Sequence, residues 1–272
     1  MGHPMADFTA ESTPARLPAT DDASLRVLTQ ATSAAPSHDT LFCIDPAPPP
    51  LHTQDSRRWW LPCAALRPAH SEHWRVDGRA AQSGWQQGIG FSDNGAMLFA
   101  HLRLPAGDAR AATAEAYQAL RTFVAARGYR HWLRTWNYLG AFNEGEGDAE
   151  RYRQFCVGRA EALAGHTQHP AATAIGIEGE ALHIAVLAAH APGQALENPR
   201  QTAAWRYPRD YGPQSPSFSR GMVVGEGDAA RLLLSGTASV VGHETLHPHN
   251  AMRQLPALMD NVRALLTHAA GN

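Results

Sequence analysis

Apolar positions recur with regular spacing from about residue 95 onward. Residues 95–104 (GAMLFAHLRL) and 130–140 (RHWLRTWNYLG) have the aliphatic and aromatic, partly alternating character of strands. Between them, residues 113–128 carry apolar side chains at helical spacing and end in Gly128, a residue type that commonly ends helices. These helical positions are Ala116, Tyr117, Leu120, Phe123 and Val124. The stretch therefore predicts a strand, a helix and a second strand.

The pattern continues to residue 190. Residues 150–159 (ERYRQFCVGR) predict a second helix, and residues 172–178 and 181–190 predict two strands joined by a tight turn. The order β-α-β-α-β-β is typical of an α+β unit whose helices cover one face of a sheet. We therefore predict a complete α+β unit over residues 75–192.

A shortened second unit is predicted over residues 193–272, after a loop-rich stretch. Residues 231–241 predict a strand and residues 249–269 a helix. One apolar stripe runs along this helix, formed by Met252, Leu255, Met259, Val262 and Leu266. Because such a half unit cannot cover its own sheet, we expect it to pack on the first unit or on a second copy of the chain, giving a homo-oligomer.

The N-terminal quarter of the chain has little periodicity. Residues 1–44 are rich in Ala, Ser, Thr, Pro and Asp and are interpreted as a mobile arm. Residues 45–74 include the proline-rich run DPAPPPLH and are interpreted as an extended linker segment.

Charge and composition narrow the classes of partner. A formal net charge of -2 gives no reason to expect nucleic acid or a membrane surface. All 23 basic residues are arginine, so Schiff-base chemistry and a P-loop lysine are excluded. Recognition of anions must use guanidinium groups, which suit planar carboxylates. Three cysteines without a CxxC pair, no apolar run of membrane-spanning length and no leader pattern predict a cytoplasmic protein.

Tyr152 and Arg159 are seven residues apart in the second predicted helix and thus project from the same face. A phenol and a guanidinium group on one face can both donate to a carboxylate. The alternative is an ordinary surface helix in which Arg159 pairs with Glu161 or Asp148.

Three segments resemble the chorismatases, which are built on the reactive-intermediate deaminase superfold. They are RTWNYLGAFNEGEGDAERYRQFCVGRAEAL, ENPRQTAAWRYPRDYGPQSPSFSRG and LLLSGTASVVGHET. The resemblance implies an enzyme of secondary metabolism that releases pyruvate from chorismate and leaves a dihydroxy-cyclohexadiene acid or a hydroxybenzoate. It also implies that no metal or organic cofactor takes part.

The resemblance assigns the substrate carboxylates to two Tyr/Arg pairs, Tyr152 with Arg159 and Tyr207 with Arg220. Their neighbours Arg153, Arg209 and Tyr211 are alternative contacts. A small aromatic or cyclohexadiene carboxylate is accordingly the predicted ligand. Imine hydrolysis, as in the reactive-intermediate deaminases, is not expected, because Ala172 stands where those proteins have an arginine.

No residue of this sequence inherits the role of general acid. The resemblance implies that the general acid of the chorismatases is a glutamate, on a strand that follows the last helix predicted here. Glu244 or Glu180 could replace it, a second chain could supply it, or the protein could be a non-catalytic relative that binds chorismate or another aromatic acid, or acts as a partner subunit. The run GHETLHPH suggests a metal site at His243 and His247, but it lacks the HExxH order and is interpreted as a loop.

Overall fold

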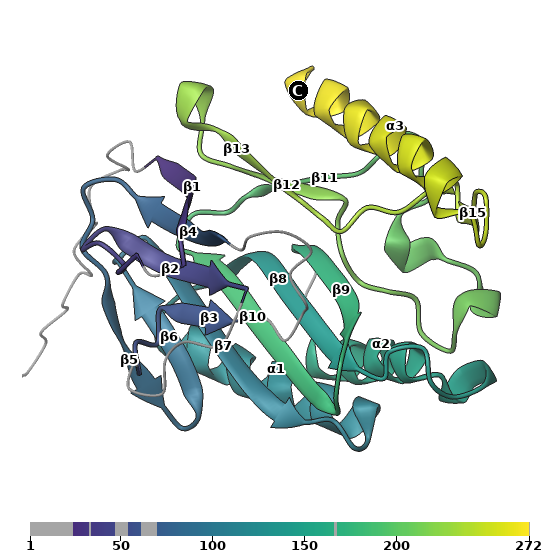
Figure 1. Ribbon diagram of the computed structural model, residues 1–272, viewed down its shortest axis with the longest axis horizontal. Coiled ribbons are helices and arrows are strands. Elements are labelled where there is room, and N and C mark those ends of the chain that lie inside the picture. Colours follow the sequence, from purple (N-terminus) through teal and green to yellow (C-terminus); the bar gives the residue numbers. More distant parts are fainter. Residues whose placement is uncertain (1–23, 33, 47–53, 61–69, 166–167, 272) are drawn as a thin grey trace, which may run out of the picture.

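The computed structural model describes residues 24–32, 34–46, 54–60, 70–165 and 168–271. Its centre is a six-stranded sheet with the strand order β5-β6-β7-β10-β8-β9, in which only the β8–β9 pair is parallel (Figure 1). The six strands are β5 (Gln82–Gln86), β6 (Ile89–Asp93), β7 (Met97–Pro105), β8 (His131–Gly140), β9 (Ala171–Ile177) and β10 (Ala181–Ala189). Strand β10 thus lies between β7 and β8 although it is the last of the six in sequence.

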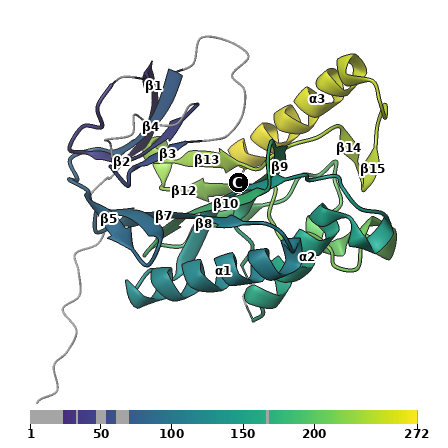
Figure 2. The same ribbon diagram turned by 60° about the horizontal axis from the view of Figure 1, so that its bottom comes forward.

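Two helices, α1 (Ala109–Ala126) and α2 (Arg151–Ala162), cover one face of this sheet (Figure 2). The predicted order β-α-β-α-β-β is confirmed by β7, α1, β8, α2, β9 and β10. Helix α1 begins before the predicted residue 113 because Asp108 caps it, with Oδ1 accepting from the Ala111 N–H at 2.9 Å. Side chains of alternate strand positions and of both helices form the core on this face.

A four-stranded sheet, in the order β1-β4-β2-β3, packs on the opposite face. Its strands are β1 (Leu25–Ala31), β2 (Thr40–Asp45), β3 (Arg58–Trp60) and β4 (His70–Val76). The prediction of a mobile arm is wrong where it covers β1 and β2, and the predicted linker 45–74 contains β3 and most of β4. Residues 1–23, 47–53 and 61–69 of these predicted segments lie outside the described residues.

Burial explains why this sheet is ordered. Phe42 is stacked between Trp74, at 4.9 Å between ring centroids, and Phe99 of the central sheet, at 3.9 Å. Trp136 of β8 packs edge-on against Phe42 and Trp74. Aromatic pairs of this kind stabilise a core beyond the area they bury, and they fix the four-stranded sheet on the central one.

The C-terminal part forms a small sheet in the order β11-β12-β13 and a long helix, α3 (Ala251–Ala270). The five strands of the C-terminal part are β11 (Gln194–Leu196), β12 (Gly221–Val224), β13 (Arg231–Leu234), β14 (Val240–Val241) and β15 (Glu244–Thr245), of which only the first three belong to this sheet. The short 3-10 helices are η1 (Gly147–Ala149), η2 (Ala204–Arg206), η3 (Arg209–Tyr211) and η4 (Gly227–Ala229). The predicted strand 231–241 is divided because Ser235 turns away from β13, donating to the Ser219 carbonyl and accepting from the Ala172 N–H.

Helix α3 lies at the outside of the molecule (Figure 1), and few of its side chains are buried. Asn261 attaches it to the body by donating to the carbonyls of Ala238 and Val240. Among the described residues, no helix is both long enough and apolar enough to cross a membrane.

Candidate functional site

A cavity of about 280 Å³ lies beside β8 and β9, at the edge of the central sheet. Helix α2 forms one wall, and two loop segments, residues 216–218 and 236–238, form the other. The second loop segment reaches the cavity because Ser235 leaves β13, as described above. Two of the four predicted site residues, Tyr152 and Arg159, line this cavity.

The Arg159 side chain is only 3% exposed, and its guanidinium group faces several neutral acceptors. Nε donates to the Tyr117 hydroxyl at 2.8 Å, and Nη1 donates to the Ser217 carbonyl oxygen at 2.5 Å. Nη2 is buried and has no partner among the described residues. The alternative ion pairs are not formed, because Glu161 pairs with Arg110 and Asp148 with Arg209 and Arg153.

Tyr117 connects Arg159 to the sheet. Its hydroxyl donates to Asn137 Oδ1 at 2.6 Å, and Asn137 Nδ2 donates to the Thr173 carbonyl at 2.9 Å. Asn137 and Thr173 both line the cavity, whereas Tyr117 is fully buried on α1. A continuous hydrogen-bonded chain therefore fixes the Arg159 guanidinium relative to β8 and β9.

Tyr152 packs against the core, stacked on Phe142 at 4.6 Å and on Phe155 at 6.1 Å between ring centroids. Burial raises the pKa of the Tyr152 hydroxyl well above its usual value. The group is therefore a neutral phenol that can donate a hydrogen bond. Tyr152 and Arg159 thus present the donor pair that their spacing predicted, and their role in binding stays a prediction.

The second predicted pair is formed, but it stands behind the cavity wall. Arg220 Nη2 donates to the Tyr207 hydroxyl at 3.0 Å and to the Thr202 carbonyl at 2.8 Å. The Arg220 guanidinium lies 5.2 Å from the ring centroid of Phe218, which lines the cavity. Neither Arg220 nor Tyr207 lines the cavity itself in this conformation. Tyr152 and Arg159 therefore line the cavity, and the Arg220/Tyr207 pair lies next to it, beside Phe218.

The three alternative substrate contacts, Arg153, Arg209 and Tyr211, have other partners in the structure. Arg153 pairs with Glu150 and Asp148, and Arg209 pairs with Asp148. Tyr211 is exposed and lies within 3.3 Å of His243 Nδ1.

Three arginines are buried among the described residues, namely Arg134, Arg159 and Arg220. None of them forms an ion pair with a described carboxylate. Arg134 is connected to the cavity through Thr173, whose hydroxyl accepts from its Nη2 at 2.6 Å. Because buried charges are normally compensated, this concentration of uncompensated positive charge suits an anionic ligand.

One carboxyl group touches the second pair. Glu197 Oε1 accepts from the Arg220 backbone N–H at 3.3 Å, and its Oε2 is buried without a partner among the described residues. Burial raises the pKa of Glu197 above its usual value of 4.5. By contrast, Glu244 and Glu180, the two carboxylates considered from the sequence, are exposed and do not line the cavity.

The sequence indicated only part of this site. Periodicity identifies Tyr117 only as an apolar helix position, and no sequence pattern indicates Ser217 or Glu197 as site residues. The signals were a phenol in an otherwise apolar stripe and a carboxylate next to Asn198 and Pro199, neither of which points to a partner distant in sequence. The described part of the chain contains no group of three or more His, Cys, Asp or Glu residues arranged to hold a metal ion.

Comparison with known proteins gives the family of the chain. The family model "Chorismatase FkbO/Hyg5-like, N-terminal" matches residues 72–188. A chorismatase from Streptomyces rapamycinicus is 37% identical over 205 residues, covering 72% of this chain and 61% of the relative. A 3-hydroxybenzoate synthase from Streptomyces hygroscopicus is 34% identical over 208 residues, again 72% of this chain and 61% of the relative. The chain thus spans 61% of the length of these two curated relatives.

The likeness extends to three dimensions. A crystal structure of a chorismatase matches with a TM-score of 0.80 and 30% sequence identity, over 89% of this chain and 77% of the other. The α+β architecture predicted from the sequence is therefore the architecture of this relative. Since sequence and fold agree over most of the described residues, the chain belongs to the chorismatase family.

Proposed function

We propose that this protein acts on chorismate, cleaving its enolpyruvyl ether to release pyruvate. The reaction consumes one water when the second product is a dihydroxy-cyclohexadiene acid, and no net water when it is a hydroxybenzoate. The relatives named chorismatase and 3-hydroxybenzoate synthase support this reaction class. The observation that carries the proposal is the guanidinium of Arg159, a residue that lines the cavity and whose buried Nη2 has no partner among the described residues. A carboxylate there would receive a charge-assisted hydrogen bond, typically worth about 1.5–3 kcal/mol.

Each residue would have a distinct task. Arg159 and the neutral phenol of Tyr152 would bind one of the two carboxylates of chorismate inside the cavity. Arg220, with Tyr207, would bind the second carboxylate after a movement of the loop that carries Phe218, because Arg220 is next to this lining residue but does not line the cavity itself. No metal or organic cofactor enters this scheme.

The demanding step is transfer of a proton to the methylene carbon of the enolpyruvyl group. Among the described residues, none that lines the cavity is Asp or Glu. Glu197 has the electrostatic property that the step needs, since its raised pKa favours a protonated carboxyl. We include Glu197 as the candidate acid because it contacts the Arg220 backbone N–H; since it does not line the cavity, its role also requires the movement that brings Arg220 to the substrate.

Pyruvate release from chorismate is the direct test. We expect Arg159→Gln to lower kcat/KM at least a hundredfold and Glu197→Gln to lower kcat by 10²–10⁴-fold. Arg263→Gln is the matched control, because Arg263 is exposed on α3 and pairs only with Asp260 within its own helix. Equal turnover in all three variants would refute the assignment.

Calorimetric titration with chorismate separates this function from a binding protein. Binding that depends on Arg159 but yields no pyruvate would indicate the non-catalytic relative or partner subunit. If chorismate neither binds nor reacts, the proposal fails for this ligand.

We also propose that the protein works in the cytoplasm and self-associates through its second unit. Cys43 and Cys156 are buried free thiols, which supports a reducing compartment. Within the described residues, β11 and β13 are open edges of the small sheet, and α3 exposes an apolar stripe next to it. Neither nucleic acid nor a membrane enters the proposal.

A further inference from the structure

A second cavity, of about 220 Å³, lies between β3 and the face of the central sheet that α1 and α2 leave uncovered. Its lining combines three tryptophans with charged and imidazole side chains. The lining residues on which the argument depends are Trp59, Trp60, Trp85, His101, Arg103 and His183. None of them lines the first cavity, and the proposed chorismate reaction uses none of them.

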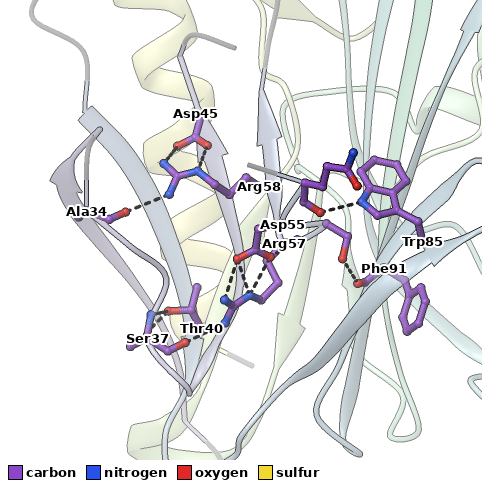
Figure 3. A network of polar contacts seen from close by, with 11 residues as sticks. Ala34, Ser37, Thr40, Asp45, Asp55, Arg57, Arg58, Trp85 and Phe91 are labelled. Carbon is purple, nitrogen blue, oxygen red and sulfur yellow. Dashed lines mark hydrogen bonds and ion pairs between the residues drawn. The ribbon is translucent and has the colours of Figure 1, made fainter. Parts of the chain in front are cut away.

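Hydrogen bonds fix the wall formed by residues 54–60 on both sides (Figure 3). The Ser56 hydroxyl donates to the Phe91 carbonyl at 2.9 Å, and the Trp85 indole N–H donates to the Gln54 carbonyl at 3.0 Å. On the other side Arg58 forms an ion pair with Asp45 at 2.9 Å. The cavity is therefore preformed by its own contacts, which lowers the ordering cost of binding a ligand.

The charge in this cavity is unbalanced. Arg58 is neutralised by Asp45, and Asp55 pairs with Arg57 at 2.7 Å. Arg103 is exposed and stands 5.6 Å from the ring centroid of Trp60. It forms no ion pair with any carboxylate in the described part of the chain. One positive charge at an aromatic rim is left to attract an anion.

A buried polar atom points to a ligand independently. His183 is 3% exposed, and its Nε2 is buried without a partner among the described residues. Its ring packs edge-on against Trp60 at 5.9 Å between centroids. Burial and the charge of Arg103 lower the pKa of His183 to about 4, so the imidazole is neutral near pH 7. A buried and unsatisfied ring nitrogen, on a residue that lines the cavity, calls for a hydrogen-bonding partner.

We propose that this cavity binds a planar aromatic monocarboxylate, with its ring between the tryptophans and its carboxylate on Arg103. His183 Nε2 then meets a polar substituent or the second carboxylate oxygen. The volume is below the roughly 300–1,000 Å³ of cavities that hold drug-sized molecules, which matches a single-ring compound. The site is separate from the proposed catalytic cavity, and its existence does not depend on the cleavage of chorismate.

Benzoate is the probe that tests this site, by calorimetric titration of the full chain at pH 7. Arg103→Gln and Trp85→Leu should each weaken benzoate binding at least tenfold, because they remove the cation and one aromatic wall. Both side chains are exposed, Trp85 by 53%, so the fold should survive either substitution. Arg263→Gln should bind as the wild type does, and so should Arg159→Gln at this site. If benzoate also enters the first cavity, Arg103→Gln should remove one of two sites.

Several results would overturn the proposal. These are no benzoate binding by the wild type at millimolar concentration, unchanged binding in both cavity variants, or loss in Arg159→Gln with none in Arg103→Gln. Benzamide, which has the same ring without the charge, should bind at least tenfold more weakly than benzoate. Equal binding of the two compounds would contradict the role given to Arg103.

Discussion

A guanidinium group is costly to bury, because the water around its charge must be replaced by anions or acceptors. Arg159 has neutral acceptors for Nε and Nη1 and none for Nη2 among the described residues. Helical periodicity could place Tyr152 and Arg159 on one face, since both belong to the same helix. It could not identify Tyr117, which is 42 residues away on another helix and reads as a core position.

Tyr117 is expected to position Arg159, and removal of its hydroxyl tests this. In Tyr117→Phe both Arg159 Nε and Asn137 Oδ1 lose a buried partner, which typically costs about 1–3 kcal/mol. We expect the free energy of unfolding in urea to fall by about this amount. We also expect calorimetry to show several-fold weaker binding of chorismate.

Tyr129→Phe separates positioning from stability. Tyr129 is also a buried phenol, and its hydroxyl donates to Asp93 Oδ1 at 2.5 Å, but it does not line the first cavity. This variant should lose stability and keep its affinity for chorismate. Equal affinities in the two variants would show that Tyr117 acts only on stability.

His101 should make the protein less stable in acid. The side chain is buried with Nε2 2.9 Å from the Ser56 carbonyl, and burial lowers its pKa from 6.5 to about 4. Above pH 6.5 the imidazole is neutral in both folded and unfolded chains, so it has no effect on the pH dependence. Between pH 6.5 and 4 only the unfolded chain takes up this proton, so stability is lost by about 1.4 kcal/mol per pH unit, or roughly 3 kcal/mol in all.

Urea unfolding of the wild type and of His101→Gln, at pH 7.5 and pH 4.5, measures this contribution. The glutamine amide can still donate to the Ser56 carbonyl but does not titrate, so its loss of stability on acidification should be smaller. The difference between the two proteins removes the contribution of carboxylates. Identical pH dependence in both would mean that His101 titrates normally.

At the scale of elements, the contact between α1 and α2 depends on a glycine. A Cβ atom at Gly158 would overlap the Arg110 carbonyl oxygen and lie 3.1 Å from the Ala114 nitrogen, and both belong to the backbone of α1. At an exposed helical position, replacing glycine with alanine stabilises by about 1 kcal/mol. Here the overlap reverses the sign, because the helices must separate.

We therefore expect Gly158→Ala to destabilise the protein by about 1–3 kcal/mol. It should also displace the neighbouring Arg159, so binding of chorismate should weaken. Thermal unfolding and calorimetry measure the two effects. Gly107→Ala is the control, since a Cβ atom there meets nothing within 4 Å and the backbone is not left-handed. Gly158→Ala as stable as this control would contradict the close packing.

Elements with local signals could be predicted, and those defined by distant pairing could not. Helices α1 and α2 and strands β7 to β10 follow from periodicity within each segment. Strand β1 does not, because most of its side chains are exposed and only its pairing with β4 shows that it is a strand. The interpretation of residues 1–44 as a mobile arm is wrong for this reason where it covers β1.

At the scale of the whole molecule, the site is assembled from segments that only the tertiary structure brings together. Residues 216–218 and 236–238 belong to the second unit and close a cavity whose floor belongs to the first. The family resemblance located Tyr207 and Arg220 in one motif. It could not show that Phe218 lines the cavity while the adjacent Arg220 does not, because that depends on how the loop packs.

The apolar stripe of α3 is the feature that bears on assembly. Of the residues predicted to form it, Met252 is 82% exposed, Leu255 56%, Met259 39% and Leu266 51%. Burying such side chains contributes about 25 cal/mol per Å² of apolar surface removed from water. Contact with a second copy would remove this surface from water on both chains at once.

We expect light scattering to give a mass above that of one 29.4 kDa chain, with the excess increasing with concentration. Leu255→Glu with Met259→Glu should return the mass to that of a single chain, because two carboxylates would then oppose two others across a symmetric contact. Arg263→Glu places a charge on the same helix outside the stripe and should leave the mass unchanged. A single-chain mass for the wild type at all concentrations would exclude self-association through α3. An assembly that persists in the double variant would instead locate the contact at the open edges β11 and β13.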